Sequence, residues 1–244
     1  NFWIKNLKIN AFYDMKKMEE GEIENLISEI REGKIDGINV TVPFKNKIIP
    51  FLDELSKDAE STQSVNTIYL RNNKIIGENT DIEGFKLSIK DTNFDIYGKK
   101  VLILGAGGVV PSIISSLIKM KAAKIFVSNR TKIKAENLKN KFKNLHILDW
   151  GKPIDTDMII NATSIGIRTD DQIELDFKKF GNVKFFYDVI YNPSETNFLK
   201  TGEKLGCKIE NGKMMFIYQA SASFKIWHNI LPKIDDDLIK FLYK

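Results

Sequence analysis

Residues 99–118 read KKVLILGAGGVVPSIISSLI, and they indicate the architecture of the chain. The apolar run VLIL is typical of a buried strand, and the residues from Val109 to Met120 have the pattern of a helix. The glycines between them allow a tight turn and the close approach of a ligand to the backbone. Pro111 fits the first helical turn, where its missing N–H would have no partner. The stretch therefore predicts a strand–turn–helix unit able to hold a pyrophosphate at the helix N-terminus.

The same stretch is the longest uncharged run of the chain, from Val101 to Ile118. Its length approaches that of a membrane span, but the GAGG segment and Pro111 divide it, so we reject that interpretation. The N-terminal residues NFWIKNLKIN lack the apolar core and cleavage site of a secretory signal. Cys207 is the single cysteine, which rules out an internal disulfide and favours a reducing compartment. We therefore expect a cytoplasmic protein.

Composition narrows the function classes further. The 244 residues can form one large domain or two modest ones, and 43% hydrophobic with 28% charged residues is typical of a globular protein. The net charge of +5 is distributed among acids, as in KKMEEGEIE, so we expect no nucleic-acid partner. The chain has two histidines, His146 and His228, which excludes a histidine-rich metal site, and we predict no metal.

From about residue 98 onward, apolar strands alternate with helices. Further strands are predicted in KIFVSNR, HILDW, DMIINAT and FFYDVIY, and a further helix from Lys132 to Phe142. Continuous apolar strands that alternate with helices indicate a parallel sheet covered on both faces. We therefore predict an α/β protein in which residues 96–212 form a Rossmann-type domain.

The first part of the chain has a different pattern, and we predict a second, mixed α/β domain there. The expected elements are strands at 10–15 and 38–42, helices at 19–31, 47–55 and 58–64, and a hairpin over 66–81 that turns at Asn72-Asn73. Two C-terminal helices, at 213–230 and 235–243, are expected to pack back on it. This domain would comprise residues 1–95 plus 213–244.

Two charged residues follow predicted strand ends in this first part. In GINVTVPFK, residues 37–45, Pro43 ends the strand and Lys45 comes two residues later. Asp81 follows another strand end, in ENTD. An ammonium group on a rigid strand end can stabilise a developing negative charge or donate a proton, and a neighbouring carboxylate can orient it.

The strand after the glycine turn ends in Ser128-Asn129-Arg130-Thr131, with Lys134 one helical turn later. NAD enzymes usually have Asp or Glu at this position for the ribose hydroxyls. A guanidinium group instead suits a 2′-phosphate, which it can bind through two hydrogen bonds. The residues therefore favour NADP over NAD, although Val110 replaces the Gly or Ala usual at the third glycine position.

Three further stretches complete a series of motifs: VNT at 65–67, GENTDIEGF at 77–85 and NATSIGI at 161–167. Together with GINVTVPFK, GAGG and NRT, in this order and spacing, they make the chain resemble the shikimate dehydrogenase family from Asn1 to about Pro232. The resemblance implies reduction of 3-dehydroshikimate to shikimate with NADPH, in the chorismate pathway to aromatic amino acids. It also implies a small-molecule substrate and a monomer or homodimer.

The resemblance also assigns roles to residues, position by position. It makes Lys45 and Asp81 the catalytic pair. The positions that match substrate contacts are Thr41, Asn66, Tyr191 and Gln219. The positions that match the cofactor site are Gly105, Ala106, Gly107, Gly108, Val109, Asn129, Arg130, Thr131, Lys134, Thr163, Ser164, Ile165, Val189, Gly212 and Met215.

The N-terminus departs from the family pattern. The family has a Ser-x-Ser-Pro motif, followed shortly by His-Asn, whose serine hydroxyls hold the substrate carboxylate. Asn1 matches the Asn of that pair, so we expect the motif to lie just ahead of Asn1 in the natural protein.

Other functions remain open at this point. One is a paralogue that acts on quinate or an aminated shikimate. The loop GAGGVVP also differs from the commoner GAGGAAR at its fifth to seventh positions, so Arg130 alone does not decide the cofactor preference. Another is a non-catalytic ligand sensor on the same scaffold, which would be expected to lose the pair that Lys45 and Asp81 form here. A third is a folate-type dehydrogenase with the same two-domain layout, against which the NTD and NATSIG stretches argue.

Overall fold

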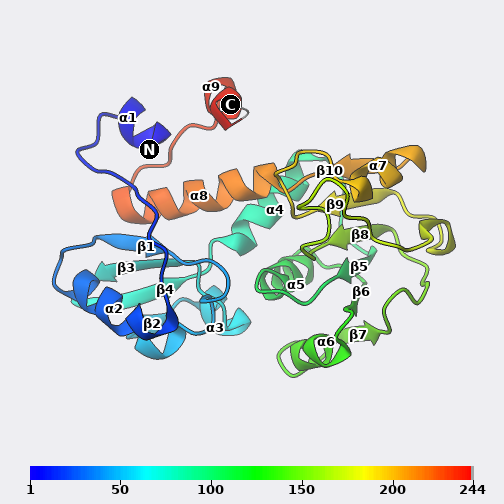
Figure 1. The fold of residues 1–244 in the computed structure, drawn as a ribbon, viewed down its shortest axis with the longest axis horizontal. Coiled ribbons are helices and arrows are strands. Elements are labelled where there is room, and N and C mark those ends of the chain that lie inside the picture. The colour runs from blue at the N-terminus through cyan, green and yellow to red at the C-terminus, as the bar shows by residue number, and fades with distance from the viewer. Residues whose placement is uncertain (243–244) are drawn as a thin grey trace.

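The computed structural model describes residues 1–242, which form two lobes side by side (Figure 1). The first lobe contains the elements α1 (Phe2–Asn6), η1 (Glu20–Glu22), α2 (Ile23–Arg31), β1 (Gly37–Asn39), η2 (Ile49–Phe51), β2 (Glu54–Leu55), α3 (Lys57–Thr62), β3 (Thr67–Arg71) and β4 (Lys74–Glu78). Helix α4 (Asp81–Asp91) leads to the second lobe.

The second lobe contains β5 (Lys100–Leu104), α5 (Val110–Lys119), β6 (Lys124–Ser128), α6 (Lys132–Lys139), β7 (Leu145–Leu148), β8 (Met158–Asn161), η3 (Phe177–Lys179), β9 (Phe185–Asp188), α7 (Asn197–Lys204) and β10 (Lys208–Glu210). Helices α8 (Lys213–His228) and α9 (Asp236–Leu242) follow. Helix α8 runs along both lobes and ends above the first (Figure 1).

The second lobe is built on a six-stranded sheet in the order β10-β9-β8-β5-β6-β7, and all of its pairs are parallel. Successive residues of β5 face opposite sides. Val101 and Ile103 pack with α5 in one core, whereas Leu102 and Leu104 pack with phenylalanines of η3 and α7 in another. The prediction of a parallel sheet covered on both faces is confirmed.

The first lobe has a four-stranded sheet in the order β1-β3-β4-β2. Strands β1, β3 and β4 are antiparallel neighbours, whereas β2 runs parallel to β4, so strand directions in this sheet are mixed. The β3–β4 hairpin turns at Asn72 and Asn73, which both have positive φ, as a tight two-residue turn requires. Helix α2 covers the sheet with the isoleucines at helical spacing that its sequence predicts.

Helices α4 and α8 cross where the two lobes meet. A methyl group at Gly84 of α4 would lie 2.8 Å from the Met215 carbonyl oxygen and 2.9 Å from the Gln219 Cβ atom, both on α8. Glycine therefore permits the close approach of these two helices. Farther along α8, the Trp227 indole N–H donates to the Ile68 carbonyl of β3 at 3.1 Å, so α8 packs back on the first lobe, as expected.

Three predictions for the first lobe were wrong or too long. Residues 10–15 form no strand, because Tyr13 is held mainly by side-chain bonds: its N–H donates to the Asn1 side chain. Residues 47–55 form the short η2 turn and β2 rather than one helix, since Pro50 restricts the backbone. Strand β1 ends at Asn39 instead of reaching residue 42.

Several elements went unpredicted, namely α1, β2, α4, α7 and β10. Tyr243, the expected end of the last helix, lies outside the described residues. Between residues 1 and 242, no helix is long and apolar enough to cross a membrane. The same residues contain no group of histidine, cysteine and acidic side chains arranged to hold a metal ion.

The α4–α8 crossing can be tested with one methyl group. We expect Gly84→Ala to lower the free energy of unfolding by about 1–3 kcal/mol, because the backbone of α8 must move away. Gly21→Ala is the matched control, since nothing lies within 4 Å of a methyl group there, and its effect should stay within about 0.5 kcal/mol. Urea unfolding measures both. Equal effects would show that the crossing tolerates a larger side chain.

Candidate functional site

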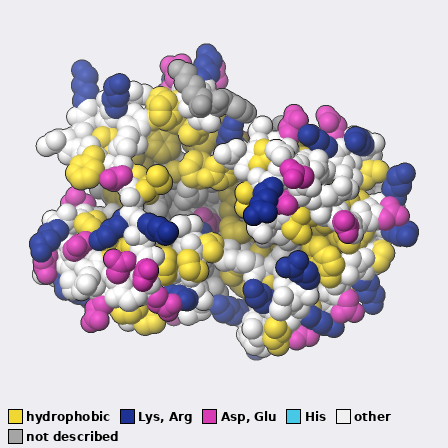
Figure 2. Space-filling model, in the orientation of Figure 1, with side chains coloured by type: hydrophobic (Ala, Val, Ile, Leu, Met, Phe, Trp, Pro, Cys, Tyr) yellow, Lys and Arg dark blue, Asp and Glu magenta, His cyan; other side chains and the backbone are white. Residues whose placement is uncertain are grey.

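A cavity of about 940 Å³ lies where the carboxyl ends of the second-lobe strands face the first lobe. Space-filling atoms in Figure 2 show hydrophobic side chains near this junction, with charges of both signs scattered over both lobes. The predicted site residues that line the cavity are Thr41, Lys45, Gly105, Ala106, Gly107, Gly108, Val109, Asn129, Arg130, Thr131, Lys134, Thr163, Ser164, Ile165, Val189 and Tyr191.

The glycine turn forms one wall of the cavity. Gly105 has φ +110°, and a methyl group there would lie 2.6 Å from the Ala162 carbonyl oxygen, so the turn requires glycine at this position. At Gly107 and Gly108 the nearest atoms to such a group are 3.8 Å and 3.6 Å away, at ordinary van der Waals distance, and both residues line the cavity. The turn leads directly into α5, whose N-terminus attracts anions.

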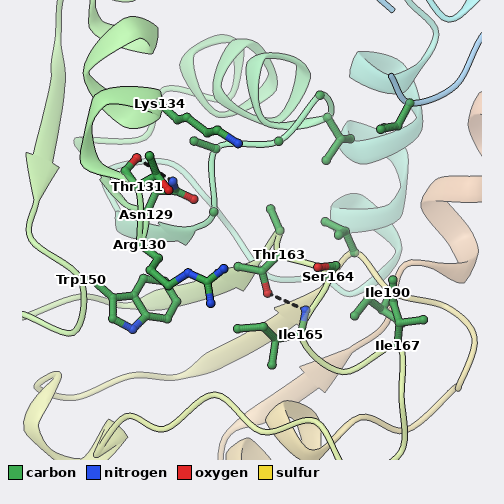
Figure 3. Close-up of a pocket in the computed structure, with 18 of the residues that line it drawn as sticks. Asn129, Arg130, Thr131, Lys134, Trp150, Thr163, Ser164, Ile165, Ile167 and Ile190 are labelled. Atoms are coloured by element: carbon green, nitrogen blue, oxygen red, sulfur yellow. Dashed lines mark hydrogen bonds between the residues drawn. The ribbon is translucent and has the colours of Figure 1, made fainter. Parts of the chain in front are cut away.

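Basic side chains mark the next strand end, after β6. Arg130 extends toward Thr163 in Figure 3, and Lys134 lies above it on α6. The segment from Asn129 to Lys134 forms one corner of the cavity. Within it, the Asn129 side-chain amide donates to the Thr131 carbonyl at 2.8 Å. Among the ion pairs of residues 1–242, none includes Arg130 or Lys134, so both cations are available to an anion in the cavity.

Lys45 and Asp81 form an ion pair across the first lobe. The lysine Nζ atom lies 2.5 Å from Asp81 Oδ2, and the two side chains are 14% and 7% exposed. Asp81 is the first residue of α4, where the helix dipole favours negative charge. Because Lys45 lines the cavity, the pair presents an ammonium group to whatever occupies it.

Backbone hydrogen bonds fix the position of Lys45. The Phe44 N–H donates to the Thr41 carbonyl at 2.8 Å and closes a turn after β1. The Val65 N–H then donates to the Lys45 carbonyl, also at 2.8 Å, just before β3. The lysine therefore lies on a short turn that is tied at both ends to the sheet.

Asn66 connects the ion pair to α8. Its amide nitrogen donates to Asp81 Oδ1 at 3.0 Å and to Gln219 Oε1 at 3.2 Å, while its oxygen accepts from the Thr80 N–H at 2.8 Å. Asp81 therefore has partners on both carboxylate oxygens. Asn66, Asp81 and Gln219 do not line the cavity themselves but meet Lys45 at its edge through these bonds.

A buried layer of hydroxyls and amides below Asn66 was not predicted. The Ser223 hydroxyl lies 2.7 Å from Thr67 Oγ1 and 3.2 Å from Thr80 Oγ1, and the Asn39 amide donates to it at 3.1 Å. Asn39 lies within GINVTV and Ser223 on α8, so only tertiary contact brings them together. The only sequence signal for this layer was the polar residue that each strand places among apolar ones, Asn39 in β1 and Thr67 in β3.

The remaining predicted residues lie at the base of α8. Tyr191 stacks on Phe216 with ring centroids 4.7 Å apart and lines the cavity. Gly212 lies against Val189, since a methyl group there would overlap the Val189 carbonyl. Met215 is buried in the core beside Val189. The structure thus places Gly212 and Met215 behind the cavity wall rather than on it.

A buried carboxylate supports the turn after β8. The Asn161 amide donates to both oxygens of Asp188 at 3.1 Å, and the Asn161 oxygen accepts from the Thr163 hydroxyl at 2.7 Å. Burial raises the pKa of the Asp188 carboxyl, and hydrogen bonds from Thr196, the Ile190 N–H and Asn161 partly offset that rise. These bonds fix the segment that carries Thr163.

Several lining residues were also missed, among them Val42, Trp150, Ala162, Ile167, Gln172, Glu174, Ile190 and Asn192. Trp150 had a usable signal, because it follows a predicted parallel strand at the edge where the other site residues gather. The segment from Ile167 to Glu174 had none, since it belongs to no regular element.

The Asp188 support predicts a pH-dependent effect of Thr196→Val. Since the pKa of folded Asp188 lies above its usual 3.8, the carboxyl favours folding most below that pH, and this contribution is lost as pH rises through the folded pKa. Valine removes a hydrogen bond that lowers the pKa, so the loss by neutral pH becomes larger. We expect a destabilisation of about 1.5–3 kcal/mol at neutral pH, shrinking toward about pH 4.

Thr201→Val is the matched control for this measurement. The Thr201 hydroxyl donates to the Asn197 carbonyl within α7 at 2.8 Å and touches no titratable group. Its cost in urea unfolding should therefore be the same at both pH values. A Thr196→Val cost that is equally independent of pH would contradict the role given to Asp188.

Comparison with known proteins gave two sequence-family matches and many related proteins. The sequence model of the shikimate dehydrogenase substrate-binding domain matches residues 1–68, and that of shikimate/quinate 5-dehydrogenase matches residues 87–168. A shikimate dehydrogenase (NADP⁺) of Pelagibacter ubique is 59% identical over 242 residues, which cover 99% of this chain and 91% of that protein.

Solved structures agree with these matches. The shikimate dehydrogenase of Aquifex aeolicus has 34% identity and a TM-score of 0.86, with 94% of this chain and 86% of that one covered. The Thermus thermophilus enzyme, in complex with NADP(H) and shikimate, has 26% identity and a TM-score of 0.86, with 95% and 87% covered. Similarity of this extent, in sequence and in fold, shows that the chain belongs to the shikimate dehydrogenase family.

Proposed function

We propose that this protein catalyses the reversible reduction of 3-dehydroshikimate to shikimate with NADPH, a step toward chorismate and the aromatic amino acids. The observation that carries the proposal is the Lys45–Asp81 pair, 2.5 Å apart, at the edge of a cavity that also contains the glycine turn. A ketone reductase needs both a proton source and a nucleotide site in one space. The 59% identity to a shikimate dehydrogenase supports the choice of substrate.

The residues around the cavity fit a phosphorylated dinucleotide. We assign the pyrophosphate to the turn from Gly105 to Val109, which lines the cavity at the start of α5. The 2′-phosphate is assigned to Arg130 and Lys134, with Asn129 and Thr131 shaping that corner. Both side chains line the cavity and neither has an ion-pair partner among residues 1–242, so a doubly charged phosphate suits them.

Thr163, Ser164 and Ile165 are assigned to the path between this corner and the ketone, with Val189 beside them at the end of the neighbouring strand β9. Gly212 and Met215 are assigned indirect roles, because they support Val189 from behind the wall. When bound, NADPH supplies the hydride.

Lys45 and Asp81 act on the oxygen of the ketone. As negative charge develops there, the Lys45 ammonium, which is 14% exposed, stabilises it electrostatically, and one of the pair delivers the proton. Asp81 holds the ammonium in place, and Asn66 fixes Asp81 by donating to its second oxygen at 3.0 Å. The fixed Asp81 carboxylate therefore orients the Lys45 ammonium group.

The substrate side of the cavity is polar, as a hydroxylated carboxylate requires. We assign the contacts to Thr41, Asn66, Tyr191 and Gln219. Thr41 and Tyr191 line the cavity, and Tyr191 is held by its stack on Phe216. Asn66 and Gln219 are hydrogen-bonded to each other at 3.2 Å, so each is oriented by the other.

We further propose two functional domains, residues 1–95 plus 213–244 for substrate and 96–212 for NADP. The separate four-stranded and six-stranded sheets support this division, as does the packing of α8 on α4 and β3. A single chain contributes the ion pair and the nucleotide cavity, which suits a monomer or homodimer. The dependence on NADPH and the single free cysteine, Cys207, favour the cytoplasm.

The test of the reaction is NADPH oxidation with 3-dehydroshikimate, and the reverse reaction with shikimate. We expect Lys45→Ala to lower kcat by about 10²–10⁴-fold because the charge-stabilising group is gone, with NADPH affinity nearly unchanged. Lys47→Ala is the matched control, since Lys47 pairs with the exposed Glu20, and it should keep wild-type turnover.

Three results would contradict the proposal. Unchanged turnover in Lys45→Ala would remove the lysine from the chemistry. Wild-type protein that binds NADPH but turns over only quinate or an aminated shikimate would identify a paralogue, and one that turns over none of the three would identify a ligand sensor.

The phosphate site is tested separately with Arg130→Ala. We expect about tenfold to hundredfold weaker NADPH binding and unchanged NADH binding, because the guanidinium reads only the 2′-phosphate. Lys100→Ala is the control, as Lys100 begins β5 at the strand end away from the cavity and pairs with Asp155 at 2.6 Å. Calorimetric titration measures the affinities. Equal losses for the two cofactors would mean that Arg130 does not bind the 2′-phosphate.

A further inference from the structure

Trp150 lines the nucleotide cavity from a strand end to which no role has been assigned so far. It follows β7, whose last residue, Leu148, is in register with Ser128 at the end of β6. Carboxyl ends of parallel strands meet at one edge of a sheet, so the corner after β7 lies next to the corner that carries Arg130. The phosphate-binding corner therefore has an aromatic neighbour.

The position of Trp150 is fixed by its own chain segment. The Ser128 hydroxyl donates to the Asp149 carbonyl at 3.1 Å, and the Asp149 carboxylate pairs with Lys132 at 2.7 Å. Gly151 follows with φ +76°, a conformation that turns the chain directly after the tryptophan. The corner is thus tied to β6 and to the start of α6.

The indole has two different environments. Part of it packs against the apolar core that includes Leu104 and Phe126, so the ring is half-buried. The rest borders the cavity, where Figure 3 shows the ring beside the Arg130 side chain as that chain extends toward Thr163. An aromatic ring that is fixed by a core on one side and borders a cavity on the other can stack on a flat ring bound in that cavity.

We propose that Trp150 is a binding residue of the nucleotide site, whose indole stacks on the adenine ring of the cofactor. The inference rests on the proposed function, since it requires an adenine nucleotide in this cavity. With phosphate at Arg130 and Lys134, the adenosine base must lie within a few ångströms of that corner, and Trp150 is the aromatic residue among those lining the cavity there.

The chemistry separates this contact from that of Arg130. Stacking depends on the aromatic face of the base and does not involve the 2′-phosphate. Arg130 instead binds the 2′-phosphate through its guanidinium group. Loss of Trp150 should therefore weaken every adenosine ligand alike, whereas loss of Arg130 should weaken chiefly those with the 2′-phosphate.

The experiment compares two adenosine fragments by calorimetric titration: 5′-AMP and 2′,5′-ADP. We expect Trp150→Leu to weaken both by about the same factor, on the order of tenfold, because one stacking contact is lost. Trp150→Phe keeps an aromatic face and should retain most of the affinity. Arg130→Ala should weaken 2′,5′-ADP much more than 5′-AMP.

Leucine preserves apolar packing against the core, so this variant separates stacking from folding. The KM for 3-dehydroshikimate and the thermal midpoint of Trp150→Leu should stay near wild type.

Tryptophan fluorescence gives a second measurement. Trp3 and Trp227 lie outside the second lobe, where their indole N–H groups donate to the carbonyl oxygens of Lys233 and Ile68. Quenching of tryptophan fluorescence by 5′-AMP should thus persist in Trp227→Phe and vanish in Trp150→Phe.

Three outcomes would overturn the inference. If Trp150→Leu bound both fragments as tightly as the wild-type protein does, the indole would not stack on the base. A loss of affinity confined to 2′,5′-ADP would place the indole at the phosphate instead. Equal losses in Trp150→Phe and Trp150→Leu would show that the aromatic face is irrelevant. Failure of the wild-type protein to bind NADPH, in contrast, would refute the proposed function itself.

Discussion

The crossing of α4 and α8 is the constraint on which the site depends. Asp81 begins α4, and Gln219 lies on α8 next to the contact at Gly84. The distance between the two helices therefore determines whether Asn66 can bond to both Asp81 and Gln219, as it does at 3.0 Å and 3.2 Å. A single glycine thus controls a polar arrangement several residues away, because protein interiors are packed too tightly to absorb a displaced helix.

The partly buried ion pair is a poor source of stability. Removing two charges from water costs more than their attraction commonly returns, and a well-packed apolar pair is often at least as stable. Asp81 offsets part of this cost with the Asn66 amide and the N-terminus of α4. An ammonium that remains 14% exposed at a cavity is better explained by what it does to a ligand than by what it contributes to folding.

The second lobe could be predicted from sequence because its signals are local. Buried parallel strands are continuous apolar runs, and the glycine turn between Leu104 and Val110 leaves few alternatives. The first lobe was harder, since β2 has two residues and its pairing with β4 is a tertiary effect. Pro50 lies in the stretch where a helix was expected, so that expectation underrated the proline.

The residues of the candidate site also divide into those with a local sequence signal and those without one. Lys45, Asp81 and Arg130 follow strand ends, and strand ends can be predicted. Ser223 and Asn39 are 184 residues apart, and nothing local links them. Met215 shows the opposite limit: a helical position does not reveal whether a side chain faces a cavity or, as here, a core.

The hydroxyl layer beneath Asn66 has a consequence for synthesis of the chain on the ribosome. The second lobe is contiguous from β5 to β10, so its sheet can form as soon as those residues emerge. The first lobe emerges earlier but lacks the Ser223 hydroxyl and the Trp227 indole until α8 is made. Its amides and hydroxyls must keep water as partners during that interval, and contacts of such long range slow the final step. The first lobe therefore cannot complete its polar layer until one of the last helices of the chain has been made.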